Sequence, residues 1–213
     1  MSEQAKLAEI LGLSRLIAVV TIDNAADALP LADALLAGGV RVIEVALRSP
    51  ASLDALRRIA AERPAAVVGA GTVRKPRDVD AAREAGARFV VSPGFTPALD
   101  GAARDARMPW LPGVATASEI LVALEAGRDL LKFFPAEAAG GARALSAFAT
   151  VFPEARFCPT GGVAADNVRN YLELPNVVCV AGSWIAPAAA IKAKQWHKIH
   201  NLTSDAVALW SRA

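Results

Sequence analysis

Short apolar runs alternate with alanine-rich segments of helical spacing along most of the chain, and this alternation limits the fold more than any other feature. Runs rich in Val and Ile predict eight strands, at residues 16–22, 41–47, 66–71, 88–92, 110–114, 129–134, 155–159 and 176–182. Helical periodicity predicts helices between them, in segments such as 25–37, 52–62, 77–85, 118–126, 141–152 and 166–174. Because the strands are apolar almost without interruption, we expect a parallel sheet covered on both faces.

Eight strand–helix units most simply close into a (β/α)8 TIM barrel, and 213 residues lie near the lower end of the ~200–400 residues typical of this fold. The rival is an open doubly wound sheet, whose dinucleotide fingerprint is G-x-G-x-x-G after the first strand. The only G-x-G here is Gly69-Ala70-Gly71, after the third predicted strand, and Arg74 stands at the position of the last glycine. We therefore predict a single α/β barrel domain over residues 1–213, in which 187–213 form a polar connection and a closing helix.

Charge and hydropathy argue against several kinds of partner. The chain has 23 basic and 21 acidic residues and a formal charge of +2, which gives no electrostatic footprint for nucleic acid. No apolar run approaches the ~20 residues that span a bilayer, and the N-terminal segment carries charges where a secretory signal needs an apolar core. We expect a cytoplasmic protein with no nucleic-acid or membrane partner.

The residues most often used in metal or redox sites are placed where neither chemistry is expected. Cys158 and Cys179 form no CxxC pair, and His197 and His200 both fall in the C-terminal tail, away from every predicted strand end. We expect buried, inert thiols and surface histidines. The sequence therefore predicts no metal site and no cofactor.

Two ionisable residues interrupt predicted strands. Glu44 lies within VRVIEVAL and Lys132 within LLKFFP, although a packed barrel interior excludes charge unless something requires it. Interior side chains of this barrel form layers supplied by alternate strands, and these residues belong to strands two and six, so they can share a layer. A structural buried ion pair is the plain alternative to a catalytic one.

A lysine inside a barrel has a specific reactivity. Burial disfavours the charged form of an amine, and a neutral amine attacks a ketone to give a Schiff base. The protonated imine withdraws electrons, which permits cleavage of the carbon–carbon bond beyond the ketone's α-carbon, while a carboxylate across the barrel moves the protons. Lys132 and Glu44 are therefore candidate catalytic residues, which share a proton as an ion pair before substrate enters.

Candidate binding residues follow the predicted strand ends. Period-two alternation puts Arg48 on the same strand face as Glu44 but nearer the mouth, the end of the barrel where the strands finish. There its planar guanidinium can bind a carboxylate through two hydrogen bonds, and Thr72 can add a hydroxyl. Gly161 and Gly162 follow the seventh strand and Ser183 follows the eighth, in the two loops where this fold commonly binds phosphate. Glycines also serve ordinary turns, and a loop arginine can simply be exposed.

Several segments together resemble the 2-keto-3-deoxy-6-phosphogluconate (KDPG) aldolases, also described as 4-hydroxy-2-oxoglutarate (KHG) aldolases. The similarity runs from about residue 16 to residue 187 and rests on Glu44 with Arg48, GAGT at 69–72, KFFPAE at 132–137, CPTGG at 158–162 and GSW at 182–184. It implies a class I (β/α)8 aldolase of the Entner–Doudoroff pathway, usually a homotrimer. The implied reaction is reversible cleavage of KDPG, a phosphorylated keto sugar acid, to pyruvate and D-glyceraldehyde 3-phosphate. Cleavage of KHG to pyruvate and glyoxylate is implied as a second reaction of the same enzyme.

The resemblance implies a role for each candidate residue. Lys132 matches the Schiff-base lysine and Glu44 the proton-transfer residue. Thr160 matches a threonine associated with stereochemical preference at the aldol hydroxyl, and Phe134 a ring that packs over the bound pyruvyl group. The positions implied for the pyruvate carboxylate are Arg48 and Thr72, and those implied for phosphate are Gly161, Gly162 and Ser183.

The chain departs from the family pattern at two positions, and other functions stay open. Ala46 and Ala18 stand where close relatives commonly have threonine and proline, and the missing rim hydroxyl at Ala46 leaves fine substrate preference undecided. One alternative is a 2-keto-3-deoxy-6-phosphogalactonate aldolase of the same fold. Others are a phosphate-binding barrel isomerase or decarboxylase, in which the lysine acts only electrostatically, and a non-enzymatic scaffold or sugar-phosphate sensor.

Overall fold

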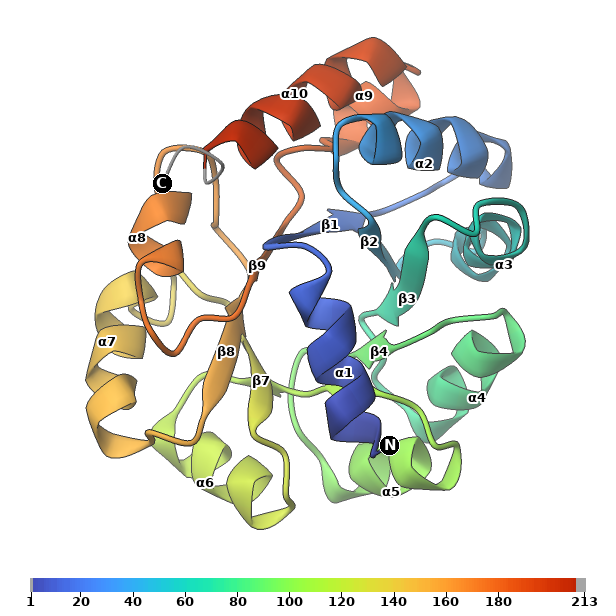
Figure 1. The fold of residues 1–213 in the computed structure, drawn as a ribbon. Coiled ribbons are helices and arrows are strands. Elements are labelled where there is room, and N and C mark those ends of the chain that lie inside the picture. The colour runs from blue at the N-terminus through green and yellow to red at the C-terminus, as the bar shows by residue number, and fades with distance from the viewer. Residues whose placement is uncertain (1, 210–213) are drawn as a thin grey trace.

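Parallel strands form the centre of the protein in the computed structural model, which describes residues 2–209 (Figure 1). One sheet has the strand order β5-β4-β3-β2-β1-β9 and a second has the order β6-β7-β8. The strands are β1 (Leu16–Val20), β2 (Val42–Ala46), β3 (Val67–Gly71), β4 (Val90–Val91), β5 (Trp110–Leu111), β6 (Gly113–Val114), β7 (Leu130–Phe133), β8 (Arg156–Pro159) and β9 (Val180–Gly182).

The two sheets are parts of one ring. β5 and β6 form a single run divided at Pro112, which has no N–H to donate to a ladder but accepts at 2.7 Å from the Lys132 N–H. On the other side, an isolated parallel bridge pairs Thr160, just after β8, with Ala181 in β9. Because β9 also pairs with β1, the strand pairing returns to its start and the predicted barrel is confirmed.

Helices cover the outside of the ring (Figure 1). All six segments predicted to be helical contain a helix, with ends shifted by a few residues at most. The helices are α1 (Glu3–Gly12), the 3-10 helix η1 (Ala25–Asp27), α2 (Ala28–Ala37), α3 (Ser52–Glu62), α4 (Pro76–Glu84), α5 (Pro97–Asp105), α6 (Ala117–Glu125), α7 (Gly141–Val151), α8 (Val168–Leu172), α9 (Ala188–Lys192) and α10 (Trp196–Ala208).

The structure corrects the sequence prediction at both ends of the chain and at one helix in the middle. Helix α1 was not predicted, nor was α5. The predicted strand 176–182 is regular only in β9; before it, Val177 forms an isolated parallel bridge with Phe157 of β8, while its own N–H donates back to the Leu174 carbonyl. The tail is not simply a polar connection before a closing helix: it first forms α9, whose Ala190 and Ile191 are buried, and then α10, which packs on α2. The predicted residues 210–213 lie outside the described part of the chain.

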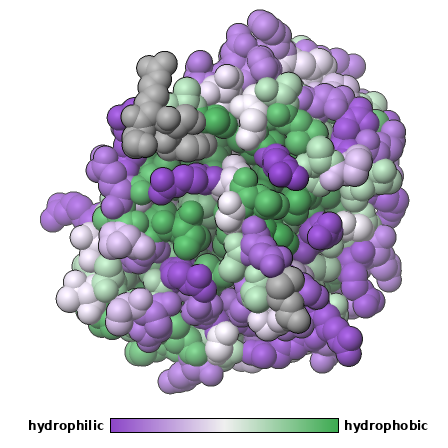
Figure 2. Space-filling view, in the orientation of Figure 1, coloured by the Kyte–Doolittle hydropathy of each residue, from purple (hydrophilic) through white to green (hydrophobic). Residues whose placement is uncertain are grey.

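Helix α1 closes the end of the barrel at which the strands begin. Its apolar residues Leu7, Ile10 and Leu11 have helical spacing and are buried in one cluster with strand residues such as Ile17 and Val42. In Figure 1 this helix lies across the front of the ring, and Figure 2 shows hydrophilic side chains around the rim of the same face with hydrophobic patches nearer its middle. The opposite end, where the strands finish, is therefore the end available to a ligand.

A buried ion pair joins α5 to the segment just before β7. The side chain of Arg128 is 2% exposed, and its Nε donates to Asp100 Oδ1 at 2.7 Å. Burial raises the pKa of Asp100, but hydrogen bonds from Arg104 and Arg128 outweigh burial, so that pKa is lowered. Among residues 2–209, no helix is long and apolar enough to cross a membrane.

Candidate active site

The structure brings Glu44 and Lys132 together inside the barrel. Glu44 lies on β2 and Lys132 on β7, and Lys132 Nζ donates to Glu44 Oε1 at 3.3 Å. Their side chains are only 2% and 7% exposed. Lys132 Nζ also lies 5.2 Å from the ring centre of Phe134, which lies at the end of the barrel where the strands finish. The amine is thus held between a proton acceptor and an aromatic ring, in surroundings of low dielectric constant.

Strand β3 makes room for this pair because it has no side chain at Gly71. A Cβ at this position would lie 2.1 Å from Glu44 Oε1 and 2.6 Å from Glu44 Cγ, which is closer than non-bonded atoms approach. Gly69 makes room in the same way for Phe89, whose ring would lie 2.5 Å from an added Cβ. The two glycines of the GAGT segment are therefore required by packing inside the barrel rather than by a turn.

Arg48 and Thr72 meet at the mouth. Arg48 Nε donates to Thr72 Oγ1 at 3.2 Å, and within residues 2–209 neither terminal guanidinium nitrogen has a hydrogen-bond partner. Thr72 has a φ of 60°, a left-handed conformation that is rare for a β-branched residue and that costs conformational energy. This arrangement leaves the planar edge of Arg48 free to bind a carboxylate in a bidentate manner.

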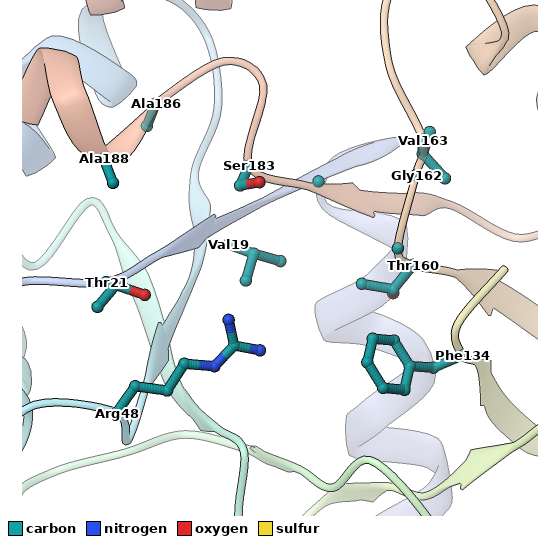
Figure 3. Close-up of a pocket in the computed structure, with 12 residues that line it drawn as sticks. Val19, Thr21, Arg48, Phe134, Thr160, Gly162, Val163, Ser183, Ala186 and Ala188 are labelled. Atoms are coloured by element: carbon teal, nitrogen blue, oxygen red, sulfur yellow. The ribbon is translucent and has the colours of Figure 1, made fainter. Parts of the chain in front are cut away.

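A pocket of about 300 Å³ opens at this end of the barrel (Figure 3). The predicted site residues that line it are Arg48, Phe134, Thr160, Gly161, Gly162 and Ser183, and the other lining residues are Val19, Thr21, Val163, Gly182, Ala186 and Ala188. In Figure 3 the Arg48 side chain extends toward the middle of the pocket, with Phe134 and Thr160 across from it. Glu44, Lys132 and Thr72 are not part of this lining, but Lys132 contacts Phe134 and Thr72 contacts Arg48.

The loop after β8 has the properties of an anion site. Gly161 and Gly162 have φ values of 96° and 81°, which glycine adopts without steric cost. The Glu137 N–H donates to the Gly161 carbonyl at 3.0 Å, and the Asn167 side-chain amide donates to the Gly162 carbonyl at 2.9 Å. In the described chain, the N–H groups of Gly162 and Ser183 donate to no protein acceptor, so they are available to a ligand.

Sequence reasoning missed one polar residue of the pocket and misplaced another position. Thr21 follows β1 and lines the pocket together with Val19, two residues earlier, as strand periodicity requires. The period-two alternation of β1 could have predicted this position, but hydroxyl side chains at strand ends are too common to indicate a binding site by themselves. Ala46, expected at the rim, is instead fully buried and does not line the pocket.

The two cysteines are buried, as predicted. Both are free and buried, and a hydrogen bond with Cys158, together with burial, raises the pKa of Cys179 well above its usual range. Both effects favour the protonated form of the Cys179 thiol over the thiolate. Within the described residues, no three His, Cys, Asp or Glu side chains are grouped so that they could hold a metal ion.

Comparison with known proteins decides the family. The Aldolase family described as KDPG and KHG aldolase matches residues 7–202. The chain belongs to the KDPG and KHG aldolase family. The 2-dehydro-3-deoxy-phosphogluconate aldolase of Pseudomonas aeruginosa is 49% identical over 194 residues, which cover 91% of this chain and 88% of that protein. The KHG/KDPG aldolase of Escherichia coli is 46% identical over 198 residues, which cover 93% of each chain.

A solved structure of another relative agrees with this membership. The KDPG aldolase from Legionella pneumophila, with pyruvate captured as a covalent carbinolamine intermediate, matches this fold with a TM-score of 0.92 and 45% identity. The match covers 94% of this chain and 98% of the Legionella chain. This KDPG/KHG family member is an aldolase, a lyase that acts on carbon–carbon bonds.

Proposed function

We propose that this aldolase reversibly cleaves KDPG to pyruvate and D-glyceraldehyde 3-phosphate through a Schiff base on Lys132, and that it also cleaves KHG to pyruvate and glyoxylate. The observation that carries the proposal is the buried contact between Lys132 and Glu44, 3.3 Å long, at the end of the barrel where Arg48 and the 161–162 loop lie. The names of the Pseudomonas and Escherichia relatives, and the covalent pyruvate in the Legionella enzyme, support it.

The Lys132–Glu44 contact provides for each proton transfer in the reaction. Lys132 gives a proton to Glu44, attacks the C2 ketone, and forms a carbinolamine; Glu44 then protonates the departing hydroxyl, which leaves as water and gives the protonated imine. Glu44, again a carboxylate, takes the proton of the C4 hydroxyl as the C3–C4 electrons move into the imine and the aldehyde leaves. Glu44 then gives this proton to C3 of the remaining enamine, and water hydrolyses the resulting imine to release pyruvate and the protonated Lys132 amine.

The mouth holds the two ends of the substrate separately. In the proposal, Arg48 and Thr72 bind the carboxylate beside C2, while the amides of Gly162 and Ser183 and the Gly161 turn bind phosphate. This places the C2 ketone near the lysine because the carboxylate and the ketone are adjacent in the substrate. The side chains proposed to pack over the pyruvyl group and to select the configuration at C4 are Phe134 and Thr160, respectively.

Trapping with borohydride tests the mechanism directly. Incubation with pyruvate and borohydride should add one reduced pyruvyl group per chain, and peptide mapping should place it on Lys132. Lys132 is buried, whereas the other five lysines are exposed. Labelling governed only by solvent accessibility would therefore modify the other lysines and not Lys132. Modification of another lysine, or labelling that persists in Lys132→Ala, would contradict the proposed Schiff base.

Kinetics with both sugar epimers test the proposed substrate. We expect a higher kcat/KM for the gluconate epimer than for the 2-keto-3-deoxy-6-phosphogalactonate epimer. The reverse order would favour the galactonate alternative while leaving the Schiff base intact.

We also propose that the enzyme is a homotrimer in the cytoplasm. Leu121 and Val122 of α6 are 51% and 46% exposed, and Val122 shares a shallow surface pocket with Phe95, an apolar surface suited to burial by another chain. The two free cysteines fit a reducing compartment. Light scattering should give three times the mass of one chain, and a monomer at micromolar concentration would contradict the trimer.

A further inference from the structure

Glu137 is the last residue of the KFFPAE segment, and the proposed mechanism gives it no role. Its carboxylate accepts a hydrogen bond from the hydroxyl of Tyr171 on α8. Tyr171 is fully buried and is the only tyrosine of the chain, whereas Glu137 is exposed. An acidic group at the surface is therefore held by a donor in the interior.

Glu137 also lies directly against the loop proposed to bind phosphate. A Cβ at Gly162 would lie 2.5 Å from Glu137 Cγ and 2.6 Å from Glu137 Cβ. The Glu137 N–H donates to the Gly161 carbonyl, which fixes the loop against the base of this side chain. A negative charge this close to the loop repels a phosphate dianion, unless the carboxylate is turned away and a donor shares its charge.

The Glu137 carboxylate lies outside the pocket. No Asp or Glu among residues 2–209 lines the pocket, and Tyr171 does not line it either. Gly141, at the start of α7, encloses the pair from another side, since a Cβ there would lie 3.4 Å from Glu137 Oε1 and 3.5 Å from the Tyr171 hydroxyl oxygen. The Glu137 carboxylate thus contacts Tyr171 of α8 and lies beside the start of α7.

We propose that Tyr171 is a specificity-determining positioning residue, which holds the Glu137 carboxylate outside the pocket so that the 161–162 loop accepts phosphorylated substrates. The inference rests on the proposed function, because it presupposes that this loop binds phosphate. Burial, and then the neighbouring Glu137, raise the pKa of Tyr171 far above its usual value, so its hydroxyl remains a donor wherever the protein is folded.

Tyr171→Phe tests the proposal because it keeps the ring and removes only the hydroxyl. We expect the KM for KDPG and the inhibition constant of inorganic phosphate to rise by about threefold to tenfold, since solvent screens part of the freed charge. The values of kcat, the KM for unphosphorylated KHG, and pyruvate trapping at Lys132 should stay unchanged. A merely structural role for the hydroxyl would change these readouts as well.

Removal of the charge should reverse the defect. In the Tyr171→Phe background, Glu137→Gln should return the phosphate constant to within about twofold of the wild-type value. Glu137→Gln alone keeps an acceptor for Tyr171 and should bind phosphate at least as tightly as the wild type. Glu173→Gln is the matched control, because it removes an exposed carboxylate next to α8 that does not line the pocket, and it should change nothing.

Three outcomes would overturn the positioning role: an unchanged phosphate constant in Tyr171→Phe, an equal loss for KDPG and KHG, or no recovery in the double variant. Stabilisation of the fold by phosphate in a thermal-shift experiment needs no turnover. If the wild type forms no adduct at Lys132, yet phosphate stabilises it and Tyr171→Phe weakens that effect, the proposed reaction is refuted and the positioning role is supported.

Discussion

Gly71→Ala tests whether the position of Glu44 controls catalysis. The added Cβ would lie 2.1 Å from Glu44 Oε1 and 2.6 Å from Glu44 Cδ, whereas non-bonded heavy atoms settle at ~3.5–4.0 Å. The carboxylate must therefore move by about 1 Å or more. Because Lys132 Nζ lies 3.3 Å from Oε1, a displacement of this size away from the amine breaks the hydrogen bond.

The expected loss of activity is larger than the expected loss of stability. General acid–base catalysis contributes ~10²–10⁴-fold, so kcat should fall by about 10²-fold or more when Glu44 is misplaced. Overpacking a barrel interior costs ~1–3 kcal/mol of unfolding free energy, which lowers the Tm by ~2–4 °C for each kcal/mol in a chain of this length. The variant should therefore be folded at 25 °C and nearly inactive.

Gly69→Ala is the matched control for Gly71→Ala. It lies on the same strand and overpacks the same interior, but its Cβ would meet the Phe89 ring rather than Glu44. A coupled assay of pyruvate release, with the Tm from circular dichroism, should show both variants destabilised and only Gly71→Ala inactive. Turnover of Gly71→Ala within about threefold of the wild type, or equal losses in both variants, would refute the reasoning.

Four further predictions concern the two ends of the substrate, the buried ion pair and metal independence. Arg48→Ala should weaken the binding of pyruvate that precedes trapping by about tenfold or more, because a charge-assisted hydrogen bond is worth ~1.5–3 kcal/mol. The yield of trapped adduct at graded pyruvate concentrations measures this affinity, and an unchanged concentration dependence would contradict the prediction. Gly162→Asp should raise the KM for KDPG far more than it alters pyruvate trapping, and an equal effect on both would argue against separate sites. Asp100→Asn should lower the unfolding free energy in urea by about 2–4 kcal/mol, because it leaves Arg128 buried without its carboxylate. In the wild type, the contribution of ionised Asp100 to the unfolding free energy is complete above about pH 4 and is lost as the pH falls through the lowered pKa of Asp100. Acid unfolding of the wild type and of Asp100→Asn would show this difference. Dialysis against EDTA should leave aldolase activity unchanged, whereas loss of activity and recovery with a divalent ion would show a metal requirement.

The barrel could be predicted because its strands are apolar on both faces and evenly spaced. Helix α1 was missed although Leu7, Ile10 and Leu11 have helical spacing, because charged residues surround them and no strand precedes them. Helix α5 contains Gly101, which weakens a helical pattern in the sequence, although the Thr96 side chain caps its start. Both signals are local and short, and burial against the barrel makes these helices stable.

The buried pair proposed to be catalytic could be predicted because charge inside an apolar strand is rare. Glu44 and Lys132 were therefore visible in the sequence, and so was their shared layer. The contact between Glu137 and Tyr171 was not, because it joins the loop after β7 to helix α8, and these segments meet only after the barrel closes. The left-handed backbone of Thr72 was also hidden, since threonine disfavours that conformation and only the folded surroundings maintain it.

The two departures from the family pattern concern packing more than substrate contact. Ala18 and Ala46 are both fully buried, and neither lines the pocket. Ala46 is paired in register with Gly71, the position that makes room for Glu44, and its carbonyl accepts a hydrogen bond from Ser52 Oγ at 2.9 Å. A threonine at residue 46 would place its hydroxyl in the barrel interior rather than at the rim. Substrate preference should therefore depend on the residues that do line the pocket, Thr21 and Thr160 among them, and only indirectly on residue 46.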